Sequence, residues 1–196
     1  MTTERSAKAC EIIAFTRILL GRGGYKSFSF ADIAEQVNIR KASIHHHFPS
    51  KEDLVKEVVI AYRQEALAGM HYLDKELHNP QAELMAYMDY WAVCIRDGSS
   101  PFCLCAMLAT ELPLLPDSIA VEVSAHFTEL ADWLASLLRK GCETGELQLN
   151  AEPIVVAKSL MATVHGAMLS ARAFNNPELF VQIVHPVIAQ ITTRLA

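Results

Sequence analysis

The sequence lacks the short motifs that mark the common enzyme classes. It contains no Walker-type phosphate loop, no dinucleotide-binding glycine pattern, no nucleophile elbow and no HExxH zinc motif. Nothing therefore supports catalysis, and we expect neither an enzyme nor a bound cofactor. Long apolar runs are also missing: none reaches the eighteen or so residues that a membrane span needs, and the N-terminus has no apolar signal-peptide core. We predict a cytoplasmic protein without a membrane partner.

Charged residues and cysteines are both scarce. Charged side chains make up 20% of the 196 residues and apolar ones 52%, a balance that excludes wholesale disorder and allows one or two compact units. The cysteines are odd in number and irregularly spaced, which argues against a secreted disulfide framework; they are Cys10, Cys94, Cys103, Cys105 and Cys142. Cys103 and Cys105 suggest a thiol sensor, but the nearest cation in sequence is Arg96, so buried, unreactive thiols are the preferred interpretation.

The net charge of -5 conceals a reversal of sign along the chain. Residues 1–51 hold eight Lys/Arg and four Asp/Glu, which gives +4, and the remainder holds nine Lys/Arg and eighteen Asp/Glu, which gives -9. A basic N-terminal segment on an acidic body suits a protein that presents one end to nucleic acid.

Residues 24–51 carry the pattern of a helix-turn-helix. Ser29, followed three residues later by Asp32, forms a capping box, so a short helix should begin at Phe30. This helix should end near Asn38, because asparagine tolerates the left-handed backbone conformation that a tight turn between helices requires.

The second helix of this pair should present polar side chains around an apolar anchor. Ile39 and Ile44 can face inward, while the positions between and after them carry donors and cations suited to DNA. Pro49 disfavours helical conformation at the residue before it, so the helix should end there. Ser50 and Asp53 then form a second capping box, which should begin a long helix.

Over nearly thirty residues this stretch resembles the DNA-reading segment of the TetR-type (TetR/AcrR) transcriptional regulators. That family commonly has a glycine and an aromatic residue, a Ser/Thr cap, Asp-Ile-Ala, a turn glycine, a polar helix ending in Tyr-x-His-Phe, and then Ser-Lys-Glu-x-Leu. The matches here are Gly24 with Tyr25, Ser29, Asp32 to Ala34, His47 with Phe48, and Ser50 to Leu54. Three positions depart from the pattern: Asn38 replaces the turn glycine, Arg40 the Ser/Thr cap and His45 the tyrosine.

The resemblance implies that eight side chains bind an operator in double-stranded DNA. Lys41, Ser43, His45 and His46 would lie at the major groove, Ser29, His47 and Lys51 would hold phosphates, and Arg40 could do either. These residue types fit such roles, because Arg and Lys bond guanine edges, while hydroxyls and imidazoles satisfy phosphate oxygens.

The three consecutive histidines, His45 to His47, raise the alternative of a metal site. Consecutive helical residues point about 100° apart, so the three rings cannot chelate one ion, and we expect no metal there. Imidazole gains charge below about pH 6.5, so DNA affinity should rise between about pH 7.5 and pH 6 if His45 or His46 meets phosphate.

Helical periodicity continues through the rest of the chain, so we predict an all-α protein. Residues 1–50 would form an N-terminal three-helix helix-turn-helix DNA-binding head, joined to a larger helical ligand-binding and dimerisation body of residues 51–196. The expected helices outside the reading stretch cover residues 6–22, 50–77, 84–95, 102–112, 117–145, 152–173 and 177–195. In the first of them the expected apolar stripe follows Ala7, Cys10, Ile13, Ala14, Arg17 and Ile18, and Ile12, Phe15, Leu19 and Leu20 widen that face.

The last two helices are apolar on more than one face. Ala162, Gly166 and Ser170 lie four residues apart, a line of small side chains that permits close approach of another helix. One apolar face should pack in the protein's own core, and the other most simply meets the same helices of a second subunit. We predict a four-helix homodimer interface, the arrangement usual in the family, with a buried hairpin in a monomer as the alternative.

The body is rich in methionine and aromatic side chains, most of which should belong to its core. The resemblance implies an inducer pocket among the middle helices. The candidate lining is Tyr87, Trp91, Met107, Phe127, Met161 and His165. Few charged residues fall among these positions, so we expect a small, mostly apolar or aromatic inducer. His126 and His165 could each orient a polar group on it or be satisfied core histidines.

These patterns together predict a sequence-specific DNA-binding transcriptional regulator. The preferred form is a ligand-released repressor that binds a near-palindromic operator as a homodimer. A transcriptional activator of the same fold, a helical ligand carrier and a thiol-based redox sensor stay open as alternatives.

Overall fold

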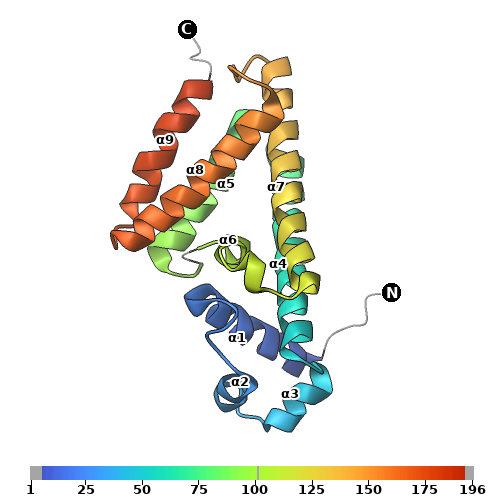
Figure 1. Cartoon of the computed structure of the whole chain (residues 1–196). Coiled ribbons are helices and arrows are strands. Elements are labelled where there is room, and N and C mark those ends of the chain that lie inside the picture. Colours follow the sequence, from blue (N-terminus) through green and yellow to red (C-terminus); the bar gives the residue numbers. More distant parts are fainter. Residues whose placement is uncertain (1–5, 101, 193–196) are drawn as a thin grey trace. The chain divides into compact units, whose positions relative to one another are not determined.

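The computed structural model describes residues 6–100 and 102–192, and these residues are mostly helical (Figure 1). The helices are α1 (Ala7–Gly23), α2 (Phe30–Gln36), α3 (Lys41–His47), α4 (Lys51–Leu77), α5 (Pro80–Asp97), α6 (Leu104–Ala109), the 3-10 turn η1 (Leu112–Leu114), α7 (Asp117–Glu143), α8 (Pro153–Ala173) and α9 (Glu178–Ile191). Within these ranges there is no strand, only an isolated antiparallel bridge between Leu147 and Thr192. The all-α prediction is confirmed.

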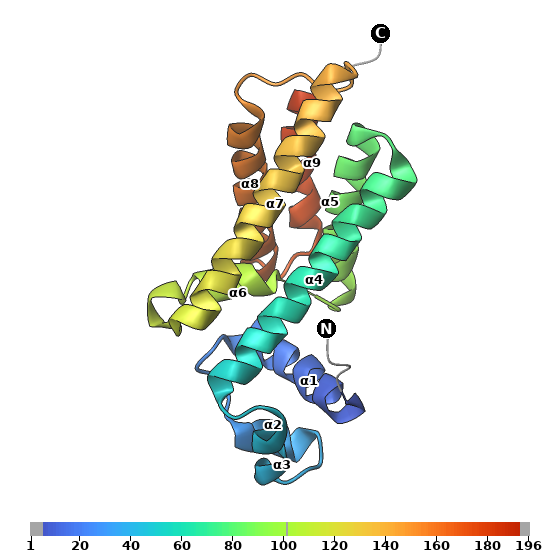
Figure 2. The ribbon, with the colours of Figure 1, turned by 90° about the vertical axis from the view of Figure 1, so that its right-hand side faces the viewer.

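The chain divides into two compact units. The first comprises residues 1–65 and 104–126, so that it contains α1, α2, α3, the first half of α4, α6, η1 and the start of α7. The second comprises residues 66–103 and 127–196 and contains the rest of α4 and α7 together with α5, α8 and α9. In the first unit α2 and α3 pack on each other and α1 packs on α2 and α6 (Figure 2).

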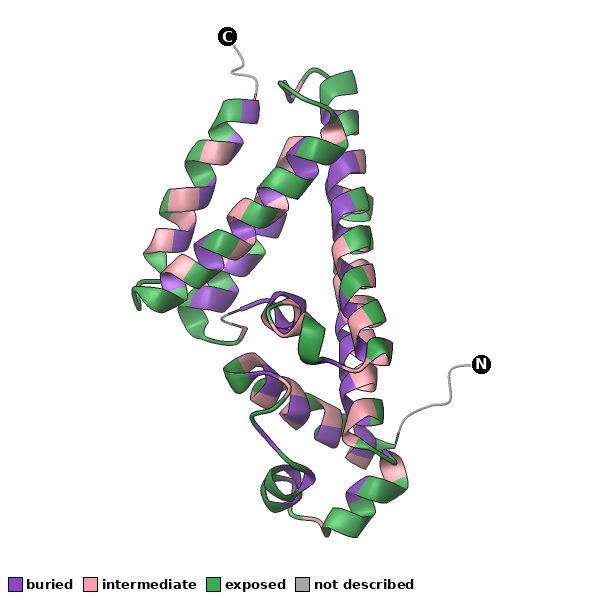
Figure 3. Ribbon diagram, viewed as in Figure 1, coloured by how far each residue is buried: buried purple, intermediate pink, exposed green. Residues whose placement is uncertain are grey.

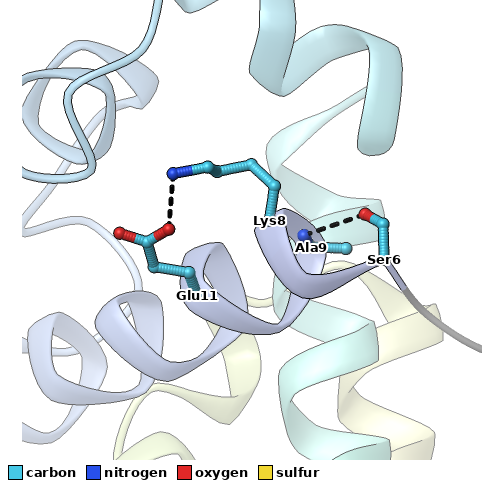
Figure 4. Close-up of polar contacts among 4 residues, drawn as sticks. All are labelled: Ser6, Lys8, Ala9 and Glu11. Atoms are coloured by element: carbon cyan, nitrogen blue, oxygen red, sulfur yellow. Dashed lines mark hydrogen bonds and ion pairs between the residues drawn. The ribbon is translucent and has the colours of Figure 1, made fainter.

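Helix α1 begins after a serine N-cap, Ser6, whose capping role was not predicted from the sequence. The Ser6 hydroxyl accepts the backbone N–H of Ala9 at 3.2 Å, and Lys8 pairs with Glu11 one turn along the helix (Figure 4). At the other end Gly24 has φ 78°, and its N–H donates to the Leu20 carbonyl at 2.9 Å. A glycine is therefore required where this helix stops.

The centre of the predicted apolar face of α1 is wrong in phase. Cys10 and Ile18 are exposed, whereas Ile12 and Leu20, expected only to widen the face, are buried together with Ala9 and Thr16. The error comes from Thr16, a polar residue that counts against burial in a periodicity argument. Its hydroxyl donates to the Ile12 carbonyl at 2.7 Å, which satisfies it locally and lets the side chain be fully buried.

Three of the later helices differ from their predicted bounds by more than two residues at one end. Helix α5 begins at Pro80, four residues before the predicted start, because the Asn79 side chain accepts the Ala82 N–H at 2.7 Å and caps the helix. Helix α6 is shorter than expected, because residues 102 and 103 lie before it and the chain turns into η1 near Pro113. Helix α9 ends at Ile191, and residues 193–195 of the prediction lie outside the described residues. Pro186 lies inside α9, where it removes one backbone donor without ending the helix.

Helices α8 and α9 lie side by side in the second unit, and α9 also contacts α5. Phe180, Val184 and Ile188 of α9 are buried, as are Leu160 and Val164 of α8. By length and mean hydropathy alone α8 could cross a membrane, although no uninterrupted apolar run of that length occurs in it. Part of this helix is buried in the protein, and such a helix is more simply a core element of a folded unit.

Candidate DNA-binding interface

The start of α2 is fixed by the capping box that the sequence predicted. The Ser29 backbone N–H donates to Asp32 Oδ2 at 2.6 Å and the Ser29 hydroxyl donates to the same oxygen at 2.8 Å, while that hydroxyl accepts the Ala31 N–H at 3.2 Å. These bonds to Ser29 hold the pKa of Asp32 below its usual value. Phe30 and Ile33 are buried, so the cap faces solvent and the helix body faces the core.

The turn between α2 and α3 adopts the conformation expected of its asparagine. Asn38 has φ 52°, in the left-handed region, and the following Ile39 N–H donates to the Ala34 carbonyl at 3.0 Å. Arg40 is the N-cap of α3, and its side chain makes no capping hydrogen bond. The guanidinium at this position is exposed and is not used to cap the helix.

Helix α3 is a short helix with one buried side chain, Ile44. Lys41, Ser43 and His46 are exposed around it. The helix ends where Pro49 predicted, since Phe48 is extended with φ -135° and ψ 106° and its side chain is buried. Because α3 is anchored in the core through Ile44 and Phe48, its solvent-facing side is available for contacts.

His45 is held by two contacts outside its own helix. Its Nδ1 lies 3.1 Å from the carbonyl oxygen of Pro49, and its ring meets the ring of Phe30 with centroids 4.8 Å apart at 63°. His46 and His47 instead pair with each other, at 5.7 Å between centroids. Among the described residues no group of three or more His, Cys, Asp or Glu is placed to hold a metal ion.

The start of α4 completes the candidate interface. The Ser50 hydroxyl donates to Asp53 Oδ2 at 2.7 Å and accepts the Asp53 N–H at 3.1 Å, the second predicted capping box. The ammonium of Lys51 donates to the Phe28 carbonyl and lies 4.0 Å from the Phe28 ring centroid and 4.9 Å from that of Tyr25. Burial lowers the pKa of Lys51. Lys51 therefore makes intramolecular contacts that its sequence motif did not predict.

Glu111 joins the interface from far along the chain. Its carboxylate accepts the Tyr25 backbone N–H at 2.7 Å, across 86 residues of sequence. The contact is close because Gly24, with φ 78° and ψ -169°, has no side chain; a Cβ there would lie 2.7 Å from Glu111 Cδ. Sequence reasoning missed Glu111, and no short motif surrounds it. The glycine at position 24 was the one sequence feature that indicated a close approach of another group to this turn.

The eight predicted DNA-binding residues come from three adjoining pieces of the first unit: the N-cap of α2, the helix α3 with its N-cap, and the start of α4. Six of them are exposed, and His47 and Lys51 are half-buried. The six are Ser29, Arg40, Lys41, Ser43, His45 and His46.

The predicted ligand residues are only partly brought together. Tyr87 and Trp91 lie one turn apart on the buried face of α5, and Phe127 meets His165 with ring centroids 5.3 Å apart. Burial lowers the pKa of His165 to about 4 and raises that of Tyr87. The Trp91 indole N–H is buried without a hydrogen-bond partner. Met107 belongs to the first unit and the other five to the second.

The predicted dimer line on α8 lies at the surface. Ala162 and Gly166 are exposed and Ser170 is half-buried. Figure 3 shows exposed and intermediate segments along α8, interspersed with buried ones. Large apolar side chains accompany them: Leu169 is 58% exposed and Phe174 75%. Such an apolar surface is the kind that a partner subunit covers.

The cysteines lie mostly inside the protein. Cys94, Cys103 and Cys105 are buried, as the preferred interpretation expected, whereas Cys10 and Cys142 are exposed. The buried histidine His126 contacts the ring of Tyr62, with centroids 5.3 Å apart.

Comparison with known proteins assigns both parts of the chain. Residues 12–58 match the model of the bacterial regulatory proteins of the tetR family, and residues 80–185 match the tetracyclin repressor-like C-terminal domain. The HTH-type transcriptional repressor DhaR of Mycobacterium sp. (strain GP1) is 24% identical over 83% of this chain and 81% of its own length.

Solved structures of regulators are similar along almost the whole chain. A transcriptional regulator of the TetR family from Agrobacterium tumefaciens has 50% identity and a TM-score of 0.94, with 95% of this chain and 98% of that one covered. A TetR transcriptional regulator from Legionella pneumophila has 27% identity and a TM-score of 0.86, with 97% and 100% covered.

Proposed function

This chain belongs to the TetR family of bacterial transcriptional regulators, and from that premise we propose that it is a cytoplasmic, ligand-released repressor that binds a near-palindromic operator as a homodimer. The observation that carries the proposal is α3, which is anchored inward by one side chain and presents its remaining polar residues outward. We assign residues 1–50 to the DNA-binding head and residues 51–196 to the ligand-binding and dimerisation body.

We place α3 in the major groove. Lys41, Ser43, His45 and His46 would meet base edges or the phosphates beside them, Ser29, His47 and Lys51 would bind phosphates, and Arg40 would do either. The support is exposure: the Arg40 side chain is not used as a cap, and Lys41 and Ser43 are exposed. Two heads of a dimer would then read half-sites about 34–36 Å apart or a multiple of that distance.

The four-helix dimer interface would form through α8 and α9. On α8 the line of small residues, exposed at Ala162 and Gly166 and half-buried at Ser170, lets a partner helix approach closely, and Leu169 and Phe174 supply apolar area around it. A Cβ added at Gly166 would meet nothing within 4 Å, so the space beside this residue is open in the single chain and available to a partner.

The inducer would bind in the second unit, near Tyr87, Trp91, Phe127, Met161 and His165. The neutral His165, the unpaired indole N–H of Trp91 and the aromatic rings beside them suit a small molecule that is mostly apolar or aromatic. Release of DNA requires that this ligand prefer a conformation other than the DNA-bound one, because a ligand with equal affinity for both shifts nothing.

Three alternative functions would require different features of the protein. An activator of the same fold would bind DNA equally well and differ only in its effect on transcription. A ligand carrier or a thiol sensor would need no DNA-reading surface, and the burial of Cys94, Cys103 and Cys105 counts against the sensor. The family consists of regulators, which leaves catalysis unsupported.

Sedimentation of Gly166→Arg tests the dimer that this proposal requires. The substitution replaces a helical glycine at an open position, so the single chain should keep its fold and gain about 0.5–1 kcal/mol of helix stability. We expect monomers and loss of tight operator binding. Gly69→Arg on α4 is the matched control, since its added Cβ also meets nothing within 4 Å. A Gly166→Arg protein that stays dimeric and binds DNA normally would contradict the proposed interface.

A further inference from the structure

We propose that His45 contacts the operator phosphates only in its protonated form, because the protein fixes its imidazole in the tautomer that leaves a bare acceptor facing the DNA. The proposal rests on the proposed function and deepens it by naming a proton as a participant in DNA binding. It concerns the position where this sequence departs from the family's tyrosine.

The tautomer follows from the partner of Nδ1. That nitrogen lies 3.1 Å from the Pro49 carbonyl oxygen, and a carbonyl oxygen only accepts hydrogen bonds. Nδ1 must therefore carry the proton of the neutral ring. The edge-on contact with Phe30, at 4.8 Å and 63°, holds the ring against rotation out of this bond. Phe30 is itself buried at the start of α2, so the residue that restrains the His45 ring is fixed in the core.

The other ring nitrogen is then left with a lone pair. Neutral imidazole has one N–H, so with Nδ1 protonated, Nε2 can only accept. Nε2 makes no hydrogen bond among the described residues, and His45 is exposed. A phosphate oxygen also only accepts, so the two repel until a second proton converts Nε2 to a donor. The tyrosine usual at this position donates its O–H at every pH near neutrality.

Within residues 6–100 and 102–192, His45 makes no ion pair with an acidic side chain. On α2 the Asp32 carboxylate is bound by Ser29, and at the start of α4 the Asp53 carboxylate is bound by Ser50. The cation Lys51 is held at the Phe28 carbonyl. On α3 itself the neighbours are basic: the exposed Lys41 one turn earlier, and His46 and His47, whose rings meet edge to face. The phosphate is therefore the anion that stabilises the proton, and binding and protonation are coupled.

The size of the effect is bounded by the number of protons taken up on binding. If only the protonated ring binds, each head takes up at most one proton, so its affinity rises by at most about tenfold for each unit by which the pH falls. A dimer that uses both heads gains at most about 100-fold per pH unit.

The test is fluorescence anisotropy of a labelled duplex that the wild-type protein enriches from a random pool at pH 6, titrated at fixed salt from pH 7.5 to 6. We expect wild-type affinity to rise by tens of fold, His45→Tyr to be nearly flat, and His46→Gln to bind more weakly while keeping the slope. His71→Gln, an exposed histidine of α4, is the control for unrelated histidines and should match the wild type.

The outcomes separate the two claims. If no duplex is enriched at any pH, the proposed function fails and this inference with it. If the protein binds a specific duplex but its affinity is flat, or His45→Tyr keeps the wild-type slope, only the inference is overturned. The tautomer is tested without DNA by nitrogen-15 NMR of the histidine rings. A neutral His45 with its proton on Nε2 would overturn the inference, and one with its proton on Nδ1 would support it.

Discussion

The contact between Gly24 and Glu111 offers a quantitative test of how the first unit is held together. Gly24 lies at φ 78° and ψ -169°, a region that only glycine adopts readily, and a Cβ there would collide with the Glu111 carboxyl group. Gly24→Ala should therefore cost free energy twice: once in the backbone, and once by displacing the carboxylate that accepts the Tyr25 N–H at 2.7 Å.

The two costs have separate magnitudes. Backbone strain of this kind amounts to about 1–3 kcal/mol. Loss of a hydrogen bond to a charged acceptor costs about 1.5–3 kcal/mol, so Gly24→Ala should lower the free energy of unfolding by about 2.5–6 kcal/mol in all. Gly98→Ala is the comparison, because Gly98 is left-handed with φ 73° and ψ 8° and its added Cβ meets nothing within 4 Å. It should lose only about 1–2 kcal/mol.

A double-mutant cycle measured by urea unfolding separates the terms. Glu111→Ala alone should cost about 1.5–3 kcal/mol, because it leaves the Tyr25 N–H without its acceptor. In that background Gly24→Ala should cost only the backbone strain, which makes the two changes non-additive by about 1.5–3 kcal/mol. Additivity of the two substitutions within about 0.5 kcal/mol would refute the reasoning.

Three further predictions concern acid stability and DNA binding. Because hydrogen bonds from Ser29 lower the folded-state pKa of Asp32, its stabilisation is present above the unfolded pKa and is lost as the pH falls through the folded one; Asp32→Asn should weaken this acid dependence in denaturant melts below about pH 5. Burial lowers the pKa of His165 to about 4, so its stabilisation is present above pH 6.5 and lost as the pH falls toward 4; His165→Gln should remove a loss of up to about 3 kcal/mol, and an unchanged pH profile would contradict this. Lys41→Ala should relax sequence preference, whereas Lys51→Ala should weaken binding to every duplex, lower the salt slope by about 1, and reduce thermal stability because the contact with the Phe28 carbonyl is lost. Equal, sequence-independent effects of both lysine substitutions would overturn this division of roles.

Local signals in the sequence were sufficient for the helix-turn-helix. Both capping boxes, at Ser29 and Ser50, bond as their spacing predicted, and Asn38 adopts the left-handed conformation that its turn required. These features involve residues at most a few positions apart. The capping hydrogen bonds and the turn form between residues that are close in the chain, so the residue types and their spacing are enough to predict them.

Features that depend on distant residues were not visible in the sequence. The acceptor for the Tyr25 N–H is Glu111, and the Lys51 ammonium lies on Phe28, so each depends on packing that no local spacing encodes. The stripe of α1 was predicted in the wrong phase because Thr16 satisfies its own hydroxyl within the helix. Which residues line a ligand site, and which face of α8 meets a partner, likewise depend on tertiary and quaternary packing.

The most direct test of the central claim is selection of duplexes from a random DNA pool by the purified protein at a stated salt concentration, followed by sequencing. The account predicts enrichment of a near-palindrome whose half-sites lie one helical turn or a multiple of it apart, and loss of that base preference in Lys41→Ala. A folded protein that enriches no sequence would contradict the assignment of α3 as a DNA-reading helix.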